Sequence, residues 1–243
     1  FFFFRKQAFD NLQKLGISKL IIIGGDGSFN ALNQFYVDFN VPFAGIPATI
    51  DNDISGTDYC LGVDTALNMI RSSVDSIRDT ASSFSRAFVI ETMGRDCGYL
   101  AMVSALANGA EVCLVPEIKY DLDAVGERLR KERAAGKRYI LGIVAEGTGM
   151  AEPLTRWMGE FLDMDARLTV LGHVQRGGSP TVYDRIMAYK FAVAAVDHLL
   201  AGETNRVVTF KNGRFGSSSI HQISDVKHEC EAGLLDLVRG LSC

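Results

Sequence analysis

The sequence of 243 residues lacks the features that identify several classes of protein. Its five cysteines are an odd number with no CxxC pair, which argues against a disulfide framework. Its net charge is −4, so no basic field favours nucleic acid or an anionic membrane as a partner. The phenylalanines at positions 1–4 form a run too short for a signal sequence or a membrane span. These absences favour a reducing, cytoplasmic location, with neither nucleic acid nor membrane as a partner.

The composition is that of a globular protein with a substantial core. With 47% hydrophobic and 22% charged residues, the chain can form one large domain or two modest ones. No internal repeat, low-complexity tract or proline-rich linker divides it. Cys97 and Cys113 lie in helix-like and strand-like surroundings, where we expect small buried hydrophobic side chains rather than nucleophiles or metal ligands.

Hydrophobic periodicity alternates between strands and helices along the chain. Short apolar runs predict buried strands at 20–23, 42–46, 87–90, 111–115, 139–144, 167–171 and 206–210. Helical spacing predicts helices at 5–15, 65–77, 98–107, 123–135, 182–200 and 226–241, with another ending near Val37 and a short one beginning at Pro153. Repeated βα units favour an α/β fold of two doubly wound, Rossmann-like lobes with mostly parallel sheets and a shared cleft.

A glycine-rich turn follows the first predicted strand. Gly24-Gly25-Asp26-Gly27-Ser28 joins that strand to a helix, which is the layout of a phosphate-binding turn. The glycines let the backbone approach a polyphosphate, and the helix offers N–H groups and a positive dipole end. Asp26 suits a phosphate carried with Mg²⁺. The alternative is that the glycines only serve a tight turn.

Two carboxylates and a hydroxyl come directly after the second predicted strand. In an extended segment, alternation would point Thr49, Asp51 and Asp53 the same way and Asn52 elsewhere. Such oxygen-bearing groups can hold Mg²⁺, accept a proton or orient a sugar hydroxyl. The alternative is a polar turn in which an aspartate caps a helix or closes an Asx-turn.

Polar residues follow three further strands in the same manner. Arg95 comes after the third strand, Glu146 after the fifth, and His173 with Arg176 after the sixth. Because ligands of open α/β sheets bind at the carboxyl ends of the strands, we expect the strand-end carboxylates to share one cleft. His173 and Arg176 are suited to grip an anionic group beside sugar hydroxyls. A single carboxylate could instead be a helix cap.

Four motifs stand out when they are taken together: Gly24-Gly-Asp-Gly-Ser28, Pro47-Ala-Thr-Ile-Asp-Asn-Asp53, Met93-Gly-Arg95 and Leu171-Gly-His-Val-Gln-Arg-Gly-Gly-Ser-Pro180. In this order they resemble the bacterial-type ATP-dependent 6-phosphofructokinases, and the resemblance extends from about Asn11 to the end of the chain. It implies transfer of the γ-phosphoryl group of ATP to the 1-hydroxyl of fructose 6-phosphate, which gives fructose 1,6-bisphosphate in glycolysis. It also implies Mg²⁺, two Rossmann-like lobes and an allosteric homotetramer.

The resemblance further implies roles for residues at matching positions. Asp51 would be the base that takes the proton of the sugar hydroxyl, with Thr49, Asp53 and Arg95 beside it in catalysis. The nucleotide phosphates would be held by Gly25, Asp26, Gly27 and Ser28, with Asp26 also on Mg²⁺. The fructose 6-phosphate contacts would be Thr49, Asp51, Met93, Gly94, Arg95, Glu146, His173 and Arg176, while Arg86 and Arg167 would reach in from a neighbouring subunit.

The family pattern also implies a division into lobes. Residues 1–62 and 175–225 match the larger, nucleotide-binding lobe, which is incomplete, and residues 63–174 and 226–243 match the smaller, fructose 6-phosphate-binding lobe. Gly27 and Ala48 are small and uncharged where pyrophosphate-using relatives carry an aspartate and a lysine. This difference favours ATP as the phosphoryl donor.

One departure from the family pattern is large. The family's first strand, its glycine-rich loop and a following arginine that neutralises the transferring phosphoryl have no counterpart in this sequence. The same region supplies much of the effector site. We therefore expect low kinase activity from this chain, and an unpaired, uncovered edge at the strand 20–23. Ala48, where glycine is usual, is a smaller departure. The alternatives are a truncated, non-catalytic sugar-phosphate-binding relic and a pyrophosphate-dependent phosphofructokinase.

Overall fold

The computed structural model describes residues 4–224 and 230–242, which belong to two compact units. Unit 1 comprises Phe1–Thr49, Asp53–Gly62 and Pro180–Glu229, and unit 2 comprises Ile50–Asn52, Val63–Ser179 and Cys230–Cys243. Among the residues described, each unit contains one sheet, and all strand pairs but one are parallel. The predicted α/β fold with mostly parallel sheets is therefore confirmed. Residues 50–52 and 175–179, which we expected in the first lobe, lie in unit 2 instead.

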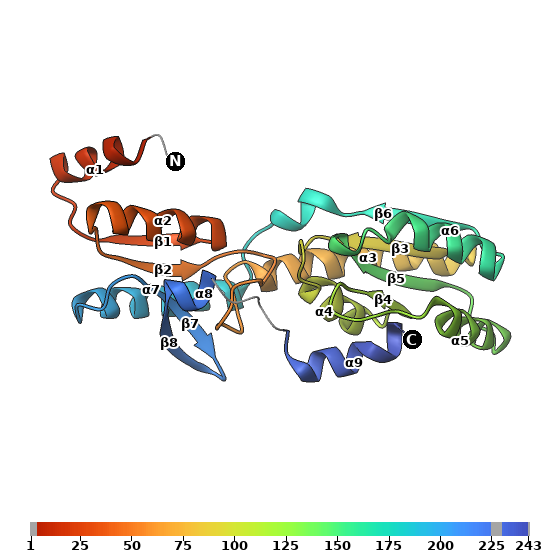
Figure 1. Ribbon diagram of the computed structural model, residues 1–243. Helices are drawn as coiled ribbons and strands as arrows, with labels where there is room; N and C mark the ends of the chain where they lie inside the picture. The colour runs from red at the N-terminus through yellow and green to blue at the C-terminus, as the bar shows by residue number, and fades with distance from the viewer. Residues whose placement is uncertain (1–3, 225–229, 243) are drawn as a thin grey trace. The chain divides into compact units, whose positions relative to one another are not determined.

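Unit 1 is built around a four-stranded sheet (Figure 1). Its strands are β1 (Leu20–Gly24), β2 (Phe43–Pro47), β7 (Arg206–Lys211) and β8 (Arg214–Ser219), in the order β1-β2-β7-β8. Its helices are α1 (Arg5–Lys14), α2 (Asp26–Phe39), α7 (Val182–Leu200) and α8 (Ile220–Ser224). Strands β1 and β2 run parallel with Gly24 opposite Pro47, so both end at the same edge of the sheet.

A hairpin completes this sheet and corrects the prediction that 206–210 is the last strand. Strands β7 and β8 pair antiparallel from Arg206 and Ser219 to Lys211 and Arg214. The turn between them is Asn212-Gly213, with φ angles of 50° and 76°. A two-residue type I′ turn needs positive φ at both positions, and Asn-Gly adopts it readily. The sequence therefore contained the signal for this hairpin.

Strand β1 lies at the edge of its sheet with one face uncovered. Ile21 is 40% exposed and Ile23 is 66% exposed, and α1 has no buried residues. Within the described residues β1 pairs only with β2, so its other edge presents backbone N–H and C=O groups. The predicted unpaired edge and uncovered apolar face are confirmed for this part of the chain.

Unit 2 is built around a second sheet whose four strands are all parallel (Figure 1). The strands are β3 (Ala87–Thr92), β4 (Val112–Leu114), β5 (Ile140–Ala145) and β6 (Ala166–Val170), in the order β4-β5-β3-β6. The helices are α3 (Val63–Phe84), α4 (Tyr99–Asn108), α5 (Leu122–Ala134), α6 (Ala151–Leu162) and α9 (Ala232–Ser242), with 3₁₀ turns η2 (Glu146–Thr148) and η3 (Gly172–Arg176). The predicted closing helix corresponds to α9, and its residues 226–229 lie outside the described part of the chain.

The core of unit 2 covers both faces of the sheet. Val89 and Val144 belong to a cluster that also contains Leu129 of α5 and Met158 of α6. Ile90, which follows Val89, is fully buried as well. Because successive side chains of a strand point to opposite faces, both faces must be covered by helices. This is why the strands read as continuous apolar runs in the sequence.

Gly126 lies where α5 packs against α6. A Cβ there would be 2.4 Å from Cε1 of Phe161, whose ring stacks on Trp157 with centroids 5.0 Å apart. Gly126→Ala should lower the free energy of unfolding by about 1–3 kcal/mol, the usual cost of overpacking, although alanine favours a helix. Gly240→Ala in α9 is the control, because no atom of the described residues lies within 4 Å of the added Cβ. Urea unfolding followed by circular dichroism measures both, and equal changes would contradict this packing.

Candidate functional site

The glycine-rich turn and Thr49 lie side by side at the carboxyl edge of the sheet in unit 1. The Ala48 N–H donates a hydrogen bond of 2.9 Å to the Gly24 carbonyl oxygen. A Cβ on Gly25 would lie 3.5 Å from the Thr49 Cβ. The parallel pairing of β1 with β2 therefore brings together two motifs that are separated in sequence by most of α2.

Helix α2 begins inside the glycine-rich turn, with Gly25 as its N-cap and Asp26 in its first turn. Asn30 Nδ2 donates to Asp26 Oδ2 over 3.1 Å, which orients that carboxylate. A Cβ on Gly24 would be 2.5 Å from Ser28 Oγ, so this position favours glycine. The half-buried Asp26 carboxylate, beside the first-turn N–H groups of a helix, is a donor set that fits Mg²⁺ carried by a polyphosphate.

The segment around Asp51 is a turn, which corrects the expectation of an extended segment. Ile50 and Asp51 adopt a turn conformation and Asn52 has a φ of 53°. Strand alternation therefore does not set the directions of Thr49, Asp51 and Asp53. Asp51 is only 3% exposed and Asn52 2%, whereas Thr49 and Asp53 are half-buried. Asn52 is thus as deeply buried as the carboxylate that precedes it.

The loop after β3 holds Arg95 next to Asp51. Arg95 Nε lies 3.4 Å from Asp51 Oδ2. Glu146 Oε1 accepts hydrogen bonds from the backbone N–H groups of Gly94 (3.2 Å) and Arg95 (2.9 Å). A Cβ on Gly147 would be 2.0 Å from the Arg95 carbonyl oxygen, so the two loops pack backbone to backbone. Arg95 has a φ of 53°, a strained conformation of the kind that clusters at active sites.

Gln175 was not predicted as a site residue, yet it ties the loop after β3 to η3. Its side chain is buried, its Oε1 accepts a hydrogen bond of 3.1 Å from the Met93 N–H, and its Nε2 donates to the Gly172 carbonyl oxygen. His173 and Arg176 lie on the same turn and are exposed. The available signal was a glutamine inside a glycine-rich motif, but its burial depends on contacts with a distant loop.

Arg86 and Arg167 lie together at one edge of the sheet of unit 2, opposite the edge at which Arg95 follows β3. Their Nε atoms are 2.7 Å and 3.0 Å from the Asp165 carboxylate. The hydrogen bond from Arg167, with the nearby charge of Arg86, holds the pKa of the Asp165 carboxyl below its usual value. Strands β3 and β6 run parallel with Phe88 opposite Arg167, so both arginines mark amino ends, whereas Arg95 follows a carboxyl end. The length of β3 separates the two positions by about 20 Å.

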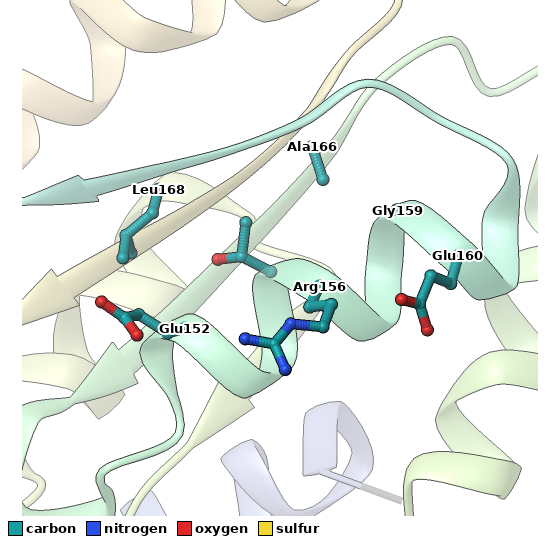
Figure 2. Close-up of a pocket in the computed structure, with 7 residues that line it drawn as sticks. Glu152, Arg156, Gly159, Glu160, Ala166 and Leu168 are labelled. Carbon is teal, nitrogen blue, oxygen red and sulfur yellow. The ribbon is translucent and has the colours of Figure 1, made fainter.

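A cavity of about 440 Å³ lies between α6 and β6. Figure 2 shows its lining, which consists of Glu152, Thr155, Arg156, Gly159 and Glu160 of α6 and Ala166 and Leu168 of β6. The spacing of four residues places Glu152, Arg156 and Glu160 on one face of the helix. None of the predicted site residues lines this cavity, so we assign it no part in the site.

The fold is that of an α/β protein with a glycine-rich turn at the carboxyl edge of the sheet in unit 1, and with Arg95 and Glu146 at the carboxyl edge of the sheet in unit 2. Such folds bind their ligands at these edges. Comparison with known proteins makes the class specific. The family profile described as Phosphofructokinase matches residues 3–199. The chain is 50% identical over 237 residues to the ATP-dependent 6-phosphofructokinase of Sulfurovum sp. (strain NBC37-1), which covers 97% of this chain and 72% of that protein. The chain belongs to the phosphofructokinase family.

Further comparisons also match phosphofructokinases. Over 240 residues the chain is 45% identical to the ATP-dependent 6-phosphofructokinase of Staphylococcus aureus (strain MRSA252), covering 98% of this chain and 74% of that protein. The phosphofructokinase structure from Saccharomyces cerevisiae matches with a TM-score of 0.83 at 29% identity, over 91% of this chain and 34% of that one. A pyrophosphate-dependent phosphofructokinase from Marinobacter aquaeolei matches at 0.80 and 21% identity, over 98% and 71%, which shows a common fold. No helix in the described residues is both long and apolar enough to cross a membrane.

Glu91, near the carboxyl end of β3, should make the stability of unit 2 depend on pH. Burial, followed by the charges of Glu146 and Glu152, raises the pKa of its carboxyl above 4.5. Because this pKa is higher in the folded than in the unfolded chain, stability falls as pH rises through the folded value. Glu91→Gln should therefore raise the Tm at about pH 7 and change it little below pH 4.5. The exposed Glu160→Gln is the control, and a pH-independent effect of Glu91→Gln would contradict the prediction.

Proposed function

We propose that the chain transfers the γ-phosphoryl group of ATP, bound with Mg²⁺, to the 1-hydroxyl of fructose 6-phosphate in glycolysis. The observation that carries this proposal is the buried Asp51 carboxylate with the Arg95 guanidinium 3.4 Å away. Relatives at 45% and 50% identity are named for a 6-phosphofructokinase. We place the reaction in the cytoplasm, in keeping with the absence of a disulfide among the cysteines of the described residues.

Asp51 is the proposed general base, which takes the proton of the sugar hydroxyl as the hydroxyl oxygen attacks the γ-phosphorus. The bond from this phosphorus to the bridging oxygen breaks, and ADP leaves. Phosphoryl transfer depends on positioning and charge neutralisation more than on covalent chemistry. Arg95 brings a positive charge beside this carboxylate, and the Glu146 carboxylate fixes the backbone that carries it. Thr49 and Asp53 flank Asp51 in the chain, and we propose that they assist it.

The nucleotide phosphates are assigned to the glycine-rich turn, with Mg²⁺ on Asp26 and the backbone of Gly25, Gly27 and Ser28 around the phosphates. The ion, when bound, would neutralise charge on the transferring phosphoryl group. A Cβ on Gly27 would meet no atom of the described part of the chain within 4 Å, so this position leaves space for a nucleotide. Ala48 is likewise small and uncharged. Both positions support ATP over pyrophosphate as the donor.

Two copies of the chain are needed, in this proposal, to complete each fructose 6-phosphate site. One copy contributes Met93, Gly94, Arg95, Glu146, His173 and Arg176. Arg86 and Arg167 lie about 20 Å away at the other end of the strands, too far to serve the same site. Asp165 holds both arginines and so presents them as a pair for a neighbouring copy. This arrangement supports the homotetramer that the family resemblance implies.

Asp51→Asn tests the base, because asparagine keeps the size and polarity of the side chain but does not accept the proton. Turnover should fall by roughly 10²–10⁴-fold relative to the unaltered chain, while affinity for fructose 6-phosphate changes little. A coupled assay measures turnover and isothermal titration measures affinity. Asp163→Asn is the matched control, since Asp163 ends α6 with a φ of 49° that asparagine tolerates.

Unchanged turnover in Asp51→Asn would place the base elsewhere. The same assays are run with ATP and, separately, with pyrophosphate. Activity with pyrophosphate alone would contradict the donor assignment, and sugar-phosphate binding without turnover from either donor would favour a non-catalytic binding protein.

Arg167→Ala tests the contribution of a second copy. Affinity for fructose 6-phosphate should fall by about 10–100-fold, the range expected when a hydrogen bond to a charged group is lost, while affinity for ATP stays constant. Isothermal titration with each ligand measures both. Arg138→Ala is the matched control, because Arg138 is an exposed arginine that precedes β5 at the same edge of the sheet. Equal losses for both ligands would show a folding defect and refute the assignment.

A further inference from the structure

Two cysteines and a glutamate from three separate segments of unit 2 converge on one point. Cys97 Sγ lies 3.9 Å from Cys230 Sγ, and Cys230 Sγ lies 3.3 Å from Glu117 Oε1. All three donor atoms lie within 4.8 Å of one another. Cys97 follows β3, Glu117 follows β4, and Cys230 precedes α9. The parallel fold thus brings together three side chains that show no metal-binding spacing in the sequence.

The separation of the two sulfur atoms fits a metal centre. Zinc–sulfur bonds of about 2.3 Å in a tetrahedral site place two thiolates about 3.8 Å apart. The observed 3.9 Å between the sulfur atoms of Cys97 and Cys230 matches this separation, so both can bind one ion without movement of the backbone. Thiolate ligands select zinc and other soft cations, whereas Mg²⁺ prefers a shell of oxygen atoms. The site is therefore chemically distinct from Asp26.

The third ligand is held by backbone groups of the loop that carries Cys97. The Gly98 N–H donates a hydrogen bond of 2.7 Å to Glu117 Oε1. A Cβ on Gly98 would be 2.6 Å from Glu117 Oε2, so glycine permits the carboxylate to approach. The Cys97 N–H in turn donates to the Gly94 carbonyl oxygen over 2.9 Å. Such outer contacts orient the ligands of a metal centre before the ion arrives.

We propose that Cys97, Glu117 and Cys230 bind one Zn²⁺, or a divalent cation of similar softness, and leave the fourth position to water. The ion joins the loop after β3, the segment after β4 and the start of α9. Thiol ligands lose their protons when they bind such a cation. The loop after β3 also carries Arg95, so the ion steadies the backbone beside the proposed base.

Co²⁺ is the probe for this site, because tetrahedral cobalt bound to thiolates absorbs strongly in the visible and near-ultraviolet. The full chain is reduced, its thiols are counted, and Co²⁺ is titrated in the presence of excess Mg²⁺. We expect one Co²⁺ per chain with a thiolate charge-transfer band, displacement by Zn²⁺, and a higher Tm with Zn²⁺ bound. Absence of the band in a chain with reduced thiols would overturn the proposal.

Variants assign the ligands. Cys97→Ser and Cys230→Ser should abolish the charge-transfer band. Glu117→Gln should weaken Co²⁺ binding by roughly 10–100-fold or more, because even the loss of a residue that only hydrogen-bonds to a metal ligand has an effect of this size. Cys60→Ser, a buried thiol of unit 1, is the control and should keep the band. Circular dichroism checks that each variant folds. If a serine variant does not fold, Glu117→Gln tests the site in its place, because Glu117 is exposed. Full binding by Cys230→Ser or Glu117→Gln would refute the site, and none of these measurements depends on turnover.

Discussion

The Glu146 carboxylate is the interaction on which the rest of the candidate site depends. It accepts two backbone hydrogen bonds, from Gly94 and Arg95, and bonds to a charged acceptor are stronger than those between neutral groups. These bonds hold Arg95 in a left-handed conformation that the side chain alone disfavours. Gly147 contributes by its lack of a Cβ, since any larger residue would collide with the Arg95 carbonyl oxygen. The guanidinium beside Asp51 is thus positioned by a residue that follows a different strand.

The parallel sheet of unit 2 divides its charged residues between two edges. At the carboxyl edge, Arg95 lies beside the proposed base and Glu146 holds its backbone, while at the amino edge Asp165 pairs Arg86 with Arg167. The strands of this sheet are parallel, so their amino ends all lie at one edge and their carboxyl ends at the other. Arg86 and Arg95 lie at opposite ends of β3 and therefore cannot meet within one chain. The site that we propose for the substrate therefore lies at one edge of this sheet, and the arginine pair that we propose for a neighbouring copy lies at the other.

The loop between β3 and α4 connects the candidate functional site with the proposed metal site of Cys97, Glu117 and Cys230. Arg95 lies in this loop two residues before Cys97, and the same loop receives the Gln175 side chain at Met93 and gives the Gly98 N–H to Glu117. With Glu146, which accepts hydrogen bonds from Gly94 and Arg95, side chains from three segments of unit 2 thus hold one short stretch of backbone. Gly94 and Gly98 allow this crowding, because an added Cβ at either would approach a neighbouring atom to within 2.6 Å. Positioning by several weak contacts is what a phosphoryl-transfer site requires.

The sequence by itself determined the elements, because apolar runs and helical periodicity depend on near neighbours. It also placed the polar motifs at strand ends, and Asn212-Gly213 signalled the hairpin that was not predicted. Only the tertiary structure decided which distant residues meet. The strand order β4-β5-β3-β6 sets the pairing of Arg86 with Arg167, the burial of Gln175 and the convergence of Cys97 with Cys230. These contacts join residues tens of positions apart, and their geometry follows from strand register and loop packing, which no local pattern encodes.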